Sequence, residues 1–323
     1  MPQIIMLTLP DFREKKIVFV QAEKDIDHQI RFWNSNIRIF KDGEPIDQIS
    51  CYLVFCIVIV GNTSITSTLI QRAKKYGISI LLLNYSLKAY AEINSLAEGN
   101  TAIRDRQYRM GDAQACILAK KLVSDKIQNQ FALLRKVKKS SKDIFDQTIA
   151  KIDDVKNLSE LLGHEGSFAN HYFQQLFSPY DWNRRAPQTK EDITNFLMDI
   201  GYTYLLNYID SILRLFGMDT YKGFYHQLFF QRKSLSCDLM EPMRPIVDHQ
   251  IIKAYNLGMI NTKDFVFKNG SYILKTDPKI RSKYSLMFFE CISKEKESIY
   301  SYLRQYYLHL MDPARYSFPQ FSL

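Results

Sequence analysis

The sequence CYLVFCIVIV, at residues 51–60, is the longest apolar run in this chain of 323 residues. A helix needs about 20 apolar residues to cross a bilayer, so the run is too short to span a membrane. Its β-branched and aromatic residues instead favour a strand that is buried on both faces. Similar short runs precede it, with a polar turn at 41–45: IIMLTL (4–9), KIVFVQ (16–21), QIRFW (29–33) and IRIF (37–40).

One helix is predicted within this strand-rich part. Residues 64–76 (SITSTLIQRAKKY) place apolar residues at helical spacing after a serine cap, and Gly77 then ends the helix. The run ISILLLN (78–84) reads as the next strand, and LKAYAEI (87–93) can pair back with it as a hairpin. Together these segments predict a small β domain that contains one helix.

The hydrophobic period changes after Asn100. No proline occurs between Pro45 and Pro179, and from Ile103 to about Lys138 the apolar residues follow helical spacing. Most of the remaining chain also reads as helical. We place the boundary at the turn-forming residues 98–100, which divides the chain into an N-terminal β domain (1–98) and a larger α-helical domain (99–323). The fold class is therefore expected to be α+β.

The positive charge of the chain is concentrated in one segment. The chain carries a formal net charge of +9, and residues 102–142 alone have eleven Lys and Arg against three Asp, a net of +8. Residues 160–249 reverse the sign, with eight basic residues against eleven acids. A basic segment beside an acid-rich one suits an enzyme that holds phosphates and also binds a cation. The alternative is a long surface helix whose lysines keep it soluble.

Glu165 is the first candidate for chemistry. It lies in LLGHEGSFANHYF (161–173), where an acid among small and large apolar residues on a helix needs a cation, because an unpaired buried carboxylate is costly. His164 and Glu165 begin like the zinc-protease pattern HExxH, but Phe168 stands where the second histidine would be. A zinc-protease site is therefore excluded here.

Two further acids and one histidine follow in the chain. Asp238 and Glu241 are three residues apart in SLSCDLMEPMRP (234–245), which puts both carboxylates on one helical face. Arg244 could neutralise them as a structural salt bridge, and His226 in GFYHQ (223–227) could be an ordinary hydrogen-bonded histidine. If these side chains converge with Glu165, they form a mostly oxygen site that suits Mg²⁺ or Mn²⁺. The residues alone then favour a metal-dependent phosphodiester enzyme.

Several longer strings together resemble one family, the CRISPR-associated integrases known as Cas protein one. They occur in the family's order from about Gly61 to Asp248, and the resemblance is weak beyond that point; they are GNTSITSTLI, GISILLLN, LLGHEGSFANHYF, DWNRRAP, DIGYTYLLN, GMDTYKGFYHQ and SLSCDLMEPMRP. The resemblance implies an N-terminal β domain used in dimer formation and a C-terminal helical catalytic domain.

The resemblance also implies roles for particular residues. By position, the family's catalytic glutamate falls on Glu165, its histidine on His226 and its final acid on Glu241, and these three would hold the metal, Mg²⁺ or Mn²⁺. Asp238 falls on an accompanying acid of the catalytic set. Because some family members have Asp where this chain has Glu241, the division of roles between Asp238 and Glu241 stays open; we expect Glu241 to be the ligand and Asp238 to support it.

The implied reaction is the capture of DNA fragments. The 3′-hydroxyl of a short duplex DNA, the prespacer, attacks a phosphodiester at a CRISPR repeat and joins the fragment to the array, and the same site hydrolyses DNA when water attacks. The implied partners are double-stranded DNA, a second copy of the chain and the small Cas protein two. Two alternatives stay open: a general metal-dependent nuclease that does not integrate, and a non-catalytic nucleic-acid scaffold in which the acids form structural ion pairs.

The chain's start bears on its location. Residues 1–16 lack the charged start, long apolar middle and small-residue cleavage site of a secretory signal. We therefore expect a protein of the prokaryotic cytoplasm with no membrane partner.

Overall fold

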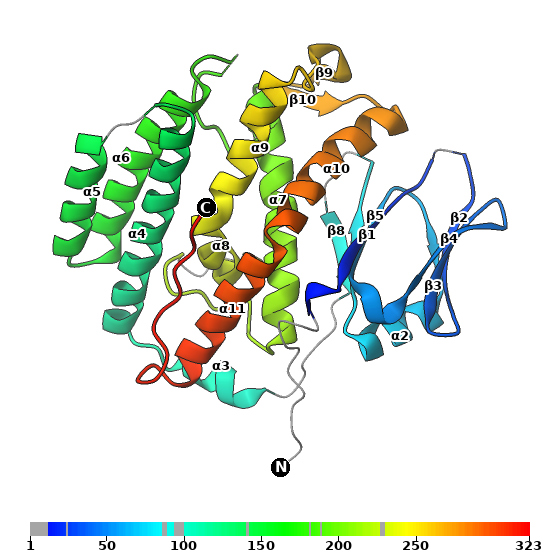
Figure 1. The fold of residues 1–323 in the computed structure, drawn as a ribbon, viewed down its shortest axis with the longest axis horizontal. Coiled ribbons are helices and arrows are strands. Elements are labelled where there is room, and N and C mark those ends of the chain that lie inside the picture. The colour runs from blue at the N-terminus through cyan, green and yellow to red at the C-terminus, as the bar shows by residue number, and fades with distance from the viewer. Residues whose placement is uncertain are drawn as a thin grey trace.

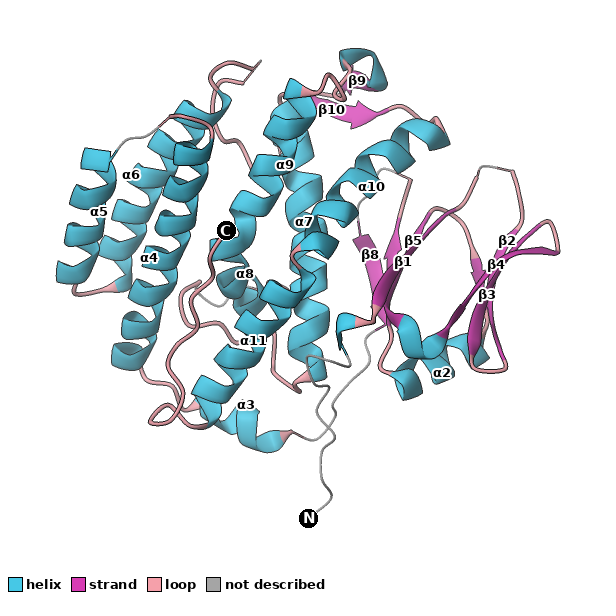
Figure 2. Ribbon diagram, in the orientation of Figure 1, coloured by secondary structure: helices cyan, strands magenta, loops and turns pink. Residues whose placement is uncertain are grey.

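The computed structural model describes residues 12–23, 25–85, 89–93, 100–139, 142–180, 182–187, 189–226 and 230–323. The N-terminal strands lie on one side of the molecule and the helices on the other (Figure 1), and helices dominate the larger part (Figure 2). The predicted α+β fold class is confirmed. The expected strand at 4–9 and the boundary residues 98 and 99 lie outside the described residues, so the division at 98/99 stays a prediction.

The apolar run at 51–60 supplies the centre of a four-stranded sheet. The sheet order is β1 (Lys16–Gln21), β5 (Val54–Val60), β7 (Ser79–Leu83) and β8 (Ala89–Ile93). Strands β1, β5 and β7 are parallel, and β8 returns antiparallel to β7, as the expected hairpin requires. Every residue of β5 is buried. Only Cys51–Leu53 depart from the predicted strand, because they form a short 3₁₀ helix before it.

A second sheet has the order β4 (Glu44–Ser50), β3 (Asn36–Lys41), β2 (His28–Trp33) and β6 (Ser64–Ile65). The prediction of a polar turn over 41–45 was wrong at its end, because the turn is confined to Asp42 and Gly43, both with positive φ. Strand β4 begins at once with Glu44 and Pro45. It lies at the sheet's edge and its first five residues are exposed, so it lacks the apolar alternation by which strands are recognised.

The predicted helix of the N-terminal part is α2 (Ser67–Tyr76). It begins three residues later than expected, because Ser64–Ile65 form β6 and the Thr66 side chain caps the helix by accepting a hydrogen bond from the Leu69 amide. Gly77 ends the helix with φ 71°, a left-handed conformation that favours glycine, as predicted. The helix leads into β7, so β5, α2 and β7 form a parallel crossover.

Nine helices are described in the second part: α3 (Thr101–Tyr108), α4 (Asp112–Lys136), α5 (Lys142–Asp154), α6 (Leu158–Phe177), α7 (Ile193–Leu215), α8 (Ser234–Met240), α9 (Arg244–Asn256), α10 (Pro278–Lys294) and α11 (Lys296–Met311). The continuous helix expected over 103–138 is wrong, since the chain breaks at 109–111 between α3 and α4. Two 3₁₀ helices, Glu241–Met243 and Thr262–Asp264, and one antiparallel hairpin, β9 (Phe265–Lys268) with β10 (Ser271–Leu274), complete this part. None of the described helices is long and apolar enough to cross a membrane.

The two parts share one hydrophobic core. Phe55 of β5 packs edge-on against Tyr208 of α7, with ring centroids 5.5 Å apart. Phe19 of β1 contacts Phe289 of α10 at 5.3 Å. Helix α7 is buried along most of its length and lies in the middle of the helical part, against α8, α9, α10 and α11 (Figure 1). The first sheet therefore holds α7 and α10 in place, and these helices in turn support α8 and α9.

The last residues return to α4 (Figure 1). Phe318 and Phe321 are buried, and the Phe321 amide donates to Asp125 Oδ2 at 2.9 Å. The Asn129 side chain donates to the Phe321 carbonyl and accepts from the Leu323 amide, each at 2.9 Å. This tail thus adds a layer over the middle of α4.

Candidate active site

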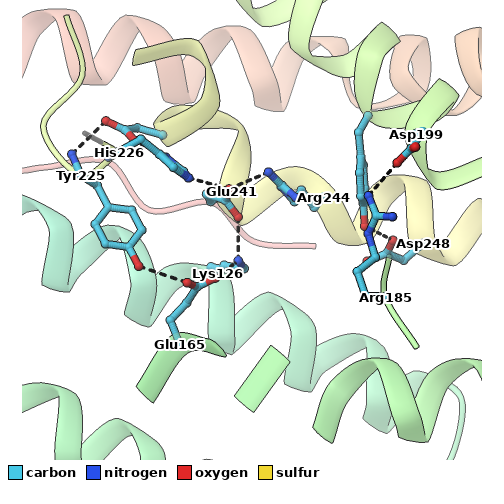
Figure 3. Close-up of polar contacts among 11 residues, drawn as sticks. Lys126, Glu165, Arg185, Asp199, Tyr225, His226, Glu241, Arg244 and Asp248 are labelled. Atoms are coloured by element: carbon cyan, nitrogen blue, oxygen red, sulfur yellow. Dashed lines mark hydrogen bonds and ion pairs between the residues drawn. The ribbon is translucent and has the colours of Figure 1, made fainter. Parts of the chain in front are cut away.

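A buried lysine joins two of the predicted acids. Lys126, in the middle of α4, places its ammonium nitrogen in contact with Glu165 Oε1 on α6 and 2.7 Å from Glu241 Oε2 (Figure 3). The three side chains are 7%, 13% and 4% exposed. Burial opposes the charged form of Lys126, but the charges of Glu241 and Glu165 outweigh it and raise the lysine's pKa. The ammonium therefore stays charged and pairs with both carboxylates, which offsets one of their two negative charges.

Glu241 lies at the end of α8, where a 3₁₀ turn (Glu241–Met243) leads into α9. Its Oε1 atom is 2.7 Å from Arg244 Nη2, so the salt bridge considered from the sequence is present, but Glu241 shares its charge with Lys126 as well. Burial would raise the pKa of Glu241, yet Arg244, Lys126 and His226 together lower it to about 2. Glu241 is therefore an ionised carboxylate inside the protein.

Asp238 is fully buried and acts on the segment that carries His226. Its Oδ2 atom accepts hydrogen bonds from the backbone amides of Phe224 and Tyr225 at 2.8 and 3.0 Å. Its Oδ1 atom accepts one from the His226 amide at 2.9 Å. The Nδ1 atom of His226 lies 2.6 Å from the same Oδ1. Gly223 permits this approach, because a Cβ there would lie 2.6 Å from Asp238 Oδ2. Both oxygens of Asp238 are thus engaged in shaping the loop.

This contact fixes the direction of the imidazole ring. In neutral His226, a proton on Nδ1 is donated to Asp238, which leaves the lone pair on Nε2. That Nε2 lies 3.8 Å from Glu241 Oε1, the oxygen that also pairs with Arg244 (Figure 3). A lone pair that faces a carboxylate oxygen is an arrangement that a cation between them stabilises.

Two aromatic hydroxyls extend the network. Tyr225 donates to the second oxygen of Glu165 at 3.1 Å, so the loop that carries His226 also holds Glu165 (Figure 3). On the other side, the Arg244 guanidinium lies over the ring of Tyr202, 4.9 Å from its centroid. The Tyr202 hydroxyl donates in turn to buried Asp248. The cluster is therefore held from α4, α6, α9 and the 223–226 loop.

The donor set fits a hard divalent cation. Two carboxylates and one imidazole nitrogen are the ligand types that Mg²⁺ and Mn²⁺ accept, and both carboxylates already point at one positive group, the Lys126 ammonium. Among the described residues, no three His, Cys, Asp or Glu side chains are spaced to hold a metal ion as they stand. Metal binding by Glu165, His226 and Glu241 therefore requires the ammonium to move aside.

The structure thus brings together all four residues singled out from the sequence, Glu165, His226, Asp238 and Glu241. Sequence reasoning missed Lys126, which it counted only as part of the basic segment, and Tyr225. A signal for Lys126 was present, because it falls on the same helical stripe as Leu122, Leu133 and other buried residues of α4. A lysine on an apolar stripe indicates a buried partner.

The basic segment 102–142 does not form one charged face. Arg104 donates to the Gly217 carbonyl, Lys120 to the Asp153 and Val155 carbonyls, and Arg109 pairs with Asp105 of its own helix. Lys126 lies inside the protein. Several basic residues of the segment therefore stabilise the fold, and exposed ones lie toward the end of α4, among them Arg135, Lys136 and Lys138.

Comparison with known proteins agrees with this geometry. A sequence model of the family described as CRISPR associated protein Cas1 matches residues 25–284, a wider span than the resemblance at 61–248. A relative from Thermodesulfovibrio yellowstonii, named CRISPR-associated endonuclease Cas1 1, is 26% identical over 298 residues, which cover 86% of this chain and 92% of the relative. Its name agrees with the predicted class of enzyme.

Two solved structures share the fold. A CAS1 protein from Thermotoga maritima superposes with a TM-score of 0.79 at 20% identity, over 92% of this chain and 97% of the other. A structure described as a casposase bound to integration product gives a TM-score of 0.77 at 22% identity, over 92% and 91% of the two chains. The family expected from the motifs is confirmed: this chain belongs to the Cas1 family of CRISPR-associated proteins.

Proposed function

We propose that this protein inserts short DNA fragments into a CRISPR array, by attack of a fragment's 3′-hydroxyl on a phosphodiester of the repeat. Membership of a family whose curated relatives are named CRISPR-associated endonucleases supports the wider class, a DNA-cutting and DNA-joining enzyme. The similarity to a casposase described as bound to integration product supports the joining reaction.

One observation carries the proposal: two buried glutamates from different elements converge on a single ammonium group, and the Nε2 atom of His226 lies 3.8 Å from an oxygen of one of them, Glu241. Stability alone does not explain two buried carboxylates, because replacing such ion pairs by apolar residues is often neutral or stabilising. A site that exchanges one cation for another accounts for why the acids are kept.

We propose Glu165, His226 and Glu241 as the ligands of Mg²⁺ or Mn²⁺. When bound, the ion would polarise the scissile phosphate and stabilise negative charge on the leaving oxygen. Asp238 is a positioning residue, because it holds the tautomer and direction of His226 and both of its oxygens already accept hydrogen bonds. Arg244 keeps Glu241 ionised and turned toward the cation position, and Tyr225 does the same for Glu165 by a hydrogen bond.

We further propose that residues 1–98 mediate homodimer formation and that 99–323 form the catalytic domain. The DNA partners are a duplex prespacer and the CRISPR repeat, and the protein partner is Cas protein two. Membership of the family supports these assignments, and we also propose that the protein acts in the cytoplasm of a prokaryote.

The test is a strand-transfer assay. The purified protein, with and without Cas protein two, is given a labelled duplex with 3′-hydroxyl ends and a plasmid that carries a CRISPR repeat, in Mg²⁺ or Mn²⁺. Glu165→Gln and Glu241→Gln remove one charge each from the site. Glu290→Gln is the matched control, because Glu290 is exposed on α10.

Label joined to the plasmid by the wild type and by Glu290→Gln, and lost in both site variants, is the expected result. DNA cleavage without joining, in the presence of the partner, would favour the general nuclease. Metal-independent DNA binding with neither cleavage nor joining in either metal would favour the scaffold.

A further inference from the structure

A basic groove lies apart from the carboxylate cluster, at the carboxyl ends of three helices. It is a cavity of about 550 Å³ between the ends of α4, α6 and α9, which run in the same direction and end at the top of the view in Figure 1. Four lysines and one histidine line it: Lys136, Lys138, Lys139, Lys253 and His249. Within the described part of the chain, no Asp or Glu side chain lines the groove.

Three of these lysines are available to a ligand. Lys139 donates to the Gln175 carbonyl at 2.6 Å and so caps the end of α6. Lys136, Lys138 and Lys253 are exposed, and no hydrogen bond or ion pair of their side chains is found among the described residues. Burial lowers the pKa of His249, and the charges of Lys136 and Lys253 lower it further. The ammonium groups of Lys136 and Lys253 are therefore both close enough to His249 to affect it electrostatically.

Lysines near helix carboxyl ends often serve only to offset the helix dipole. Each end carries roughly half a negative charge, so three ends contribute about −1.5. Four lysines exceed this by more than two positive charges. Since none of the described lining residues is an acid that could balance this excess, the groove suits an external anion.

The uncharged lining indicates which anion. Tyr180 lines the groove and stacks on Tyr255, with ring centroids 4.3 Å apart and planes at 17°. Leu257, 62% exposed, provides apolar surface beside it. Phosphate-binding lysines next to aromatic and apolar surface match the sugar and phosphate pattern of a nucleic-acid strand better than a free phosphate ion.

The groove is connected to the cluster by two helices. Ten residues of α4 separate Lys136 from Lys126, which is about 15 Å at 1.5 Å per residue. Nine residues of α9 separate Lys253 from Arg244, or about 14 Å. At 3.4 Å per nucleotide along a duplex strand, this distance is about four nucleotides.

We propose that this groove binds the DNA backbone about four nucleotides from the reacting phosphodiester, with Lys136 and Lys253 as its phosphate contacts. The position relative to the reaction rests on the proposed function, whereas DNA binding by the groove does not.

The test compares two double variants of equal charge change. Lys136→Gln with Lys253→Gln alters the groove, and Lys16→Gln with Lys75→Gln removes two exposed charges from β1 and α2. Binding of a labelled duplex DNA is measured without metal at several salt concentrations. Because each phosphate contact contributes about 0.9 to the salt slope, the groove variant is expected to lose about 1.8 from it. The N-terminal variant should keep the wild-type slope, and circular dichroism should show both folded.

A second arm tests the distance. Strand-transfer substrates whose duplex extends by two, four, six or eight nucleotides beyond the joined phosphate should distinguish wild type from the groove variant only at about four nucleotides and above. Equal salt slopes for groove variant and wild type would overturn the proposal even if integration succeeds. A reduced salt slope of the groove variant, together with no integration by the wild type, would support DNA binding by the groove and count against the proposed function alone.

Discussion

Lys126→Met tests the idea that the ammonium group stands where a metal ion binds. Methionine has nearly the same length and apolar stem as lysine, so the change removes the charge and little else. Wild-type Lys126 pairs with Glu165 and Glu241, and all three side chains are at most 13% exposed. The variant therefore leaves two carboxylates that share one buried site without their common cation.

The expected loss of stability follows from the remaining contacts. Removing one partner of a buried ion pair costs about 3–5 kcal/mol. Arg244 still pairs with Glu241 at 2.7 Å, and Tyr225 still donates to Glu165 at 3.1 Å. The lower end of the range, about 3 kcal/mol in the free energy of unfolding, is expected. Lys121→Met, an exposed position on the same helix, is the control and should change it by less than about 0.5 kcal/mol.

The assay is urea unfolding in chelator and at increasing Mn²⁺. Because no ammonium has to be displaced, Mn²⁺ should stabilise Lys126→Met more than it stabilises the wild type. At a hundredfold excess over its dissociation constant for the variant, Mn²⁺ should stabilise the variant by about 2.7 kcal/mol relative to chelator. A variant within about 1 kcal/mol of wild type in chelator would refute the electrostatic account. Equal Mn²⁺ stabilisation of both proteins would refute the shared cation position.

Three further changes test other parts of the structure. Asp238→Asn replaces one accepting oxygen by an NH₂ group, which then faces buried backbone N–H groups that also donate. It should lower the unfolding free energy by about 3 kcal/mol and also lower strand transfer. An unchanged stability and activity would contradict the positioning role. Phe321→Ala should cost about 3 kcal/mol by the same assay, because the ring is 3% exposed; a loss below about 1 kcal/mol would mean that the tail is dispensable. Burial raises the pKa of Asp125 to about 7, so the folded protein binds a proton that the unfolded chain releases, and stability falls as pH rises from about 4 to 7. Asp125→Asn should remove up to about 4 kcal/mol of that fall, and parallel pH profiles of the two proteins would contradict it.

The strands that could be predicted are those with continuous or alternating apolar residues. One face of strand β5 packs in the core shared with the helices and the other in a second hydrophobic cluster with the second sheet and α2, so its sequence is apolar throughout and its position follows from composition alone. Strand β4 could not be found in this way. It is held at the edge of its sheet by backbone pairing with β3, and its exposed side chains carry no pattern that reports this pairing.

The site residues likewise divide into those that could be predicted from the sequence and those that could not. Glu165, His226, Asp238 and Glu241 lie in short strings whose residue types resemble a known family. Lys126 precedes Glu165 by 39 residues, and only the packing of α4 against α6 brings them together. Regional charge was a poor guide for the same reason, because it cannot tell Lys120, bound to backbone carbonyls, from exposed Lys136.

The charges of the cluster explain why the protein can fold before it binds metal. With His226 neutral, its three carboxylates and two cations sum to −1, a small imbalance for a buried site; they are Glu165, Asp238 and Glu241 against Lys126 and Arg244. A divalent ion is then not needed for folding, in contrast to structural metal sites that unfold without metal. Relative to buffer without added metal, chelator should accordingly leave the wild-type unfolding free energy unchanged within about 0.5 kcal/mol, and it should abolish strand transfer in reactions that contain Mg²⁺ or Mn²⁺. A loss of several kcal/mol in chelator would mean that the ion, and not Lys126, holds the two glutamates together in the folded protein.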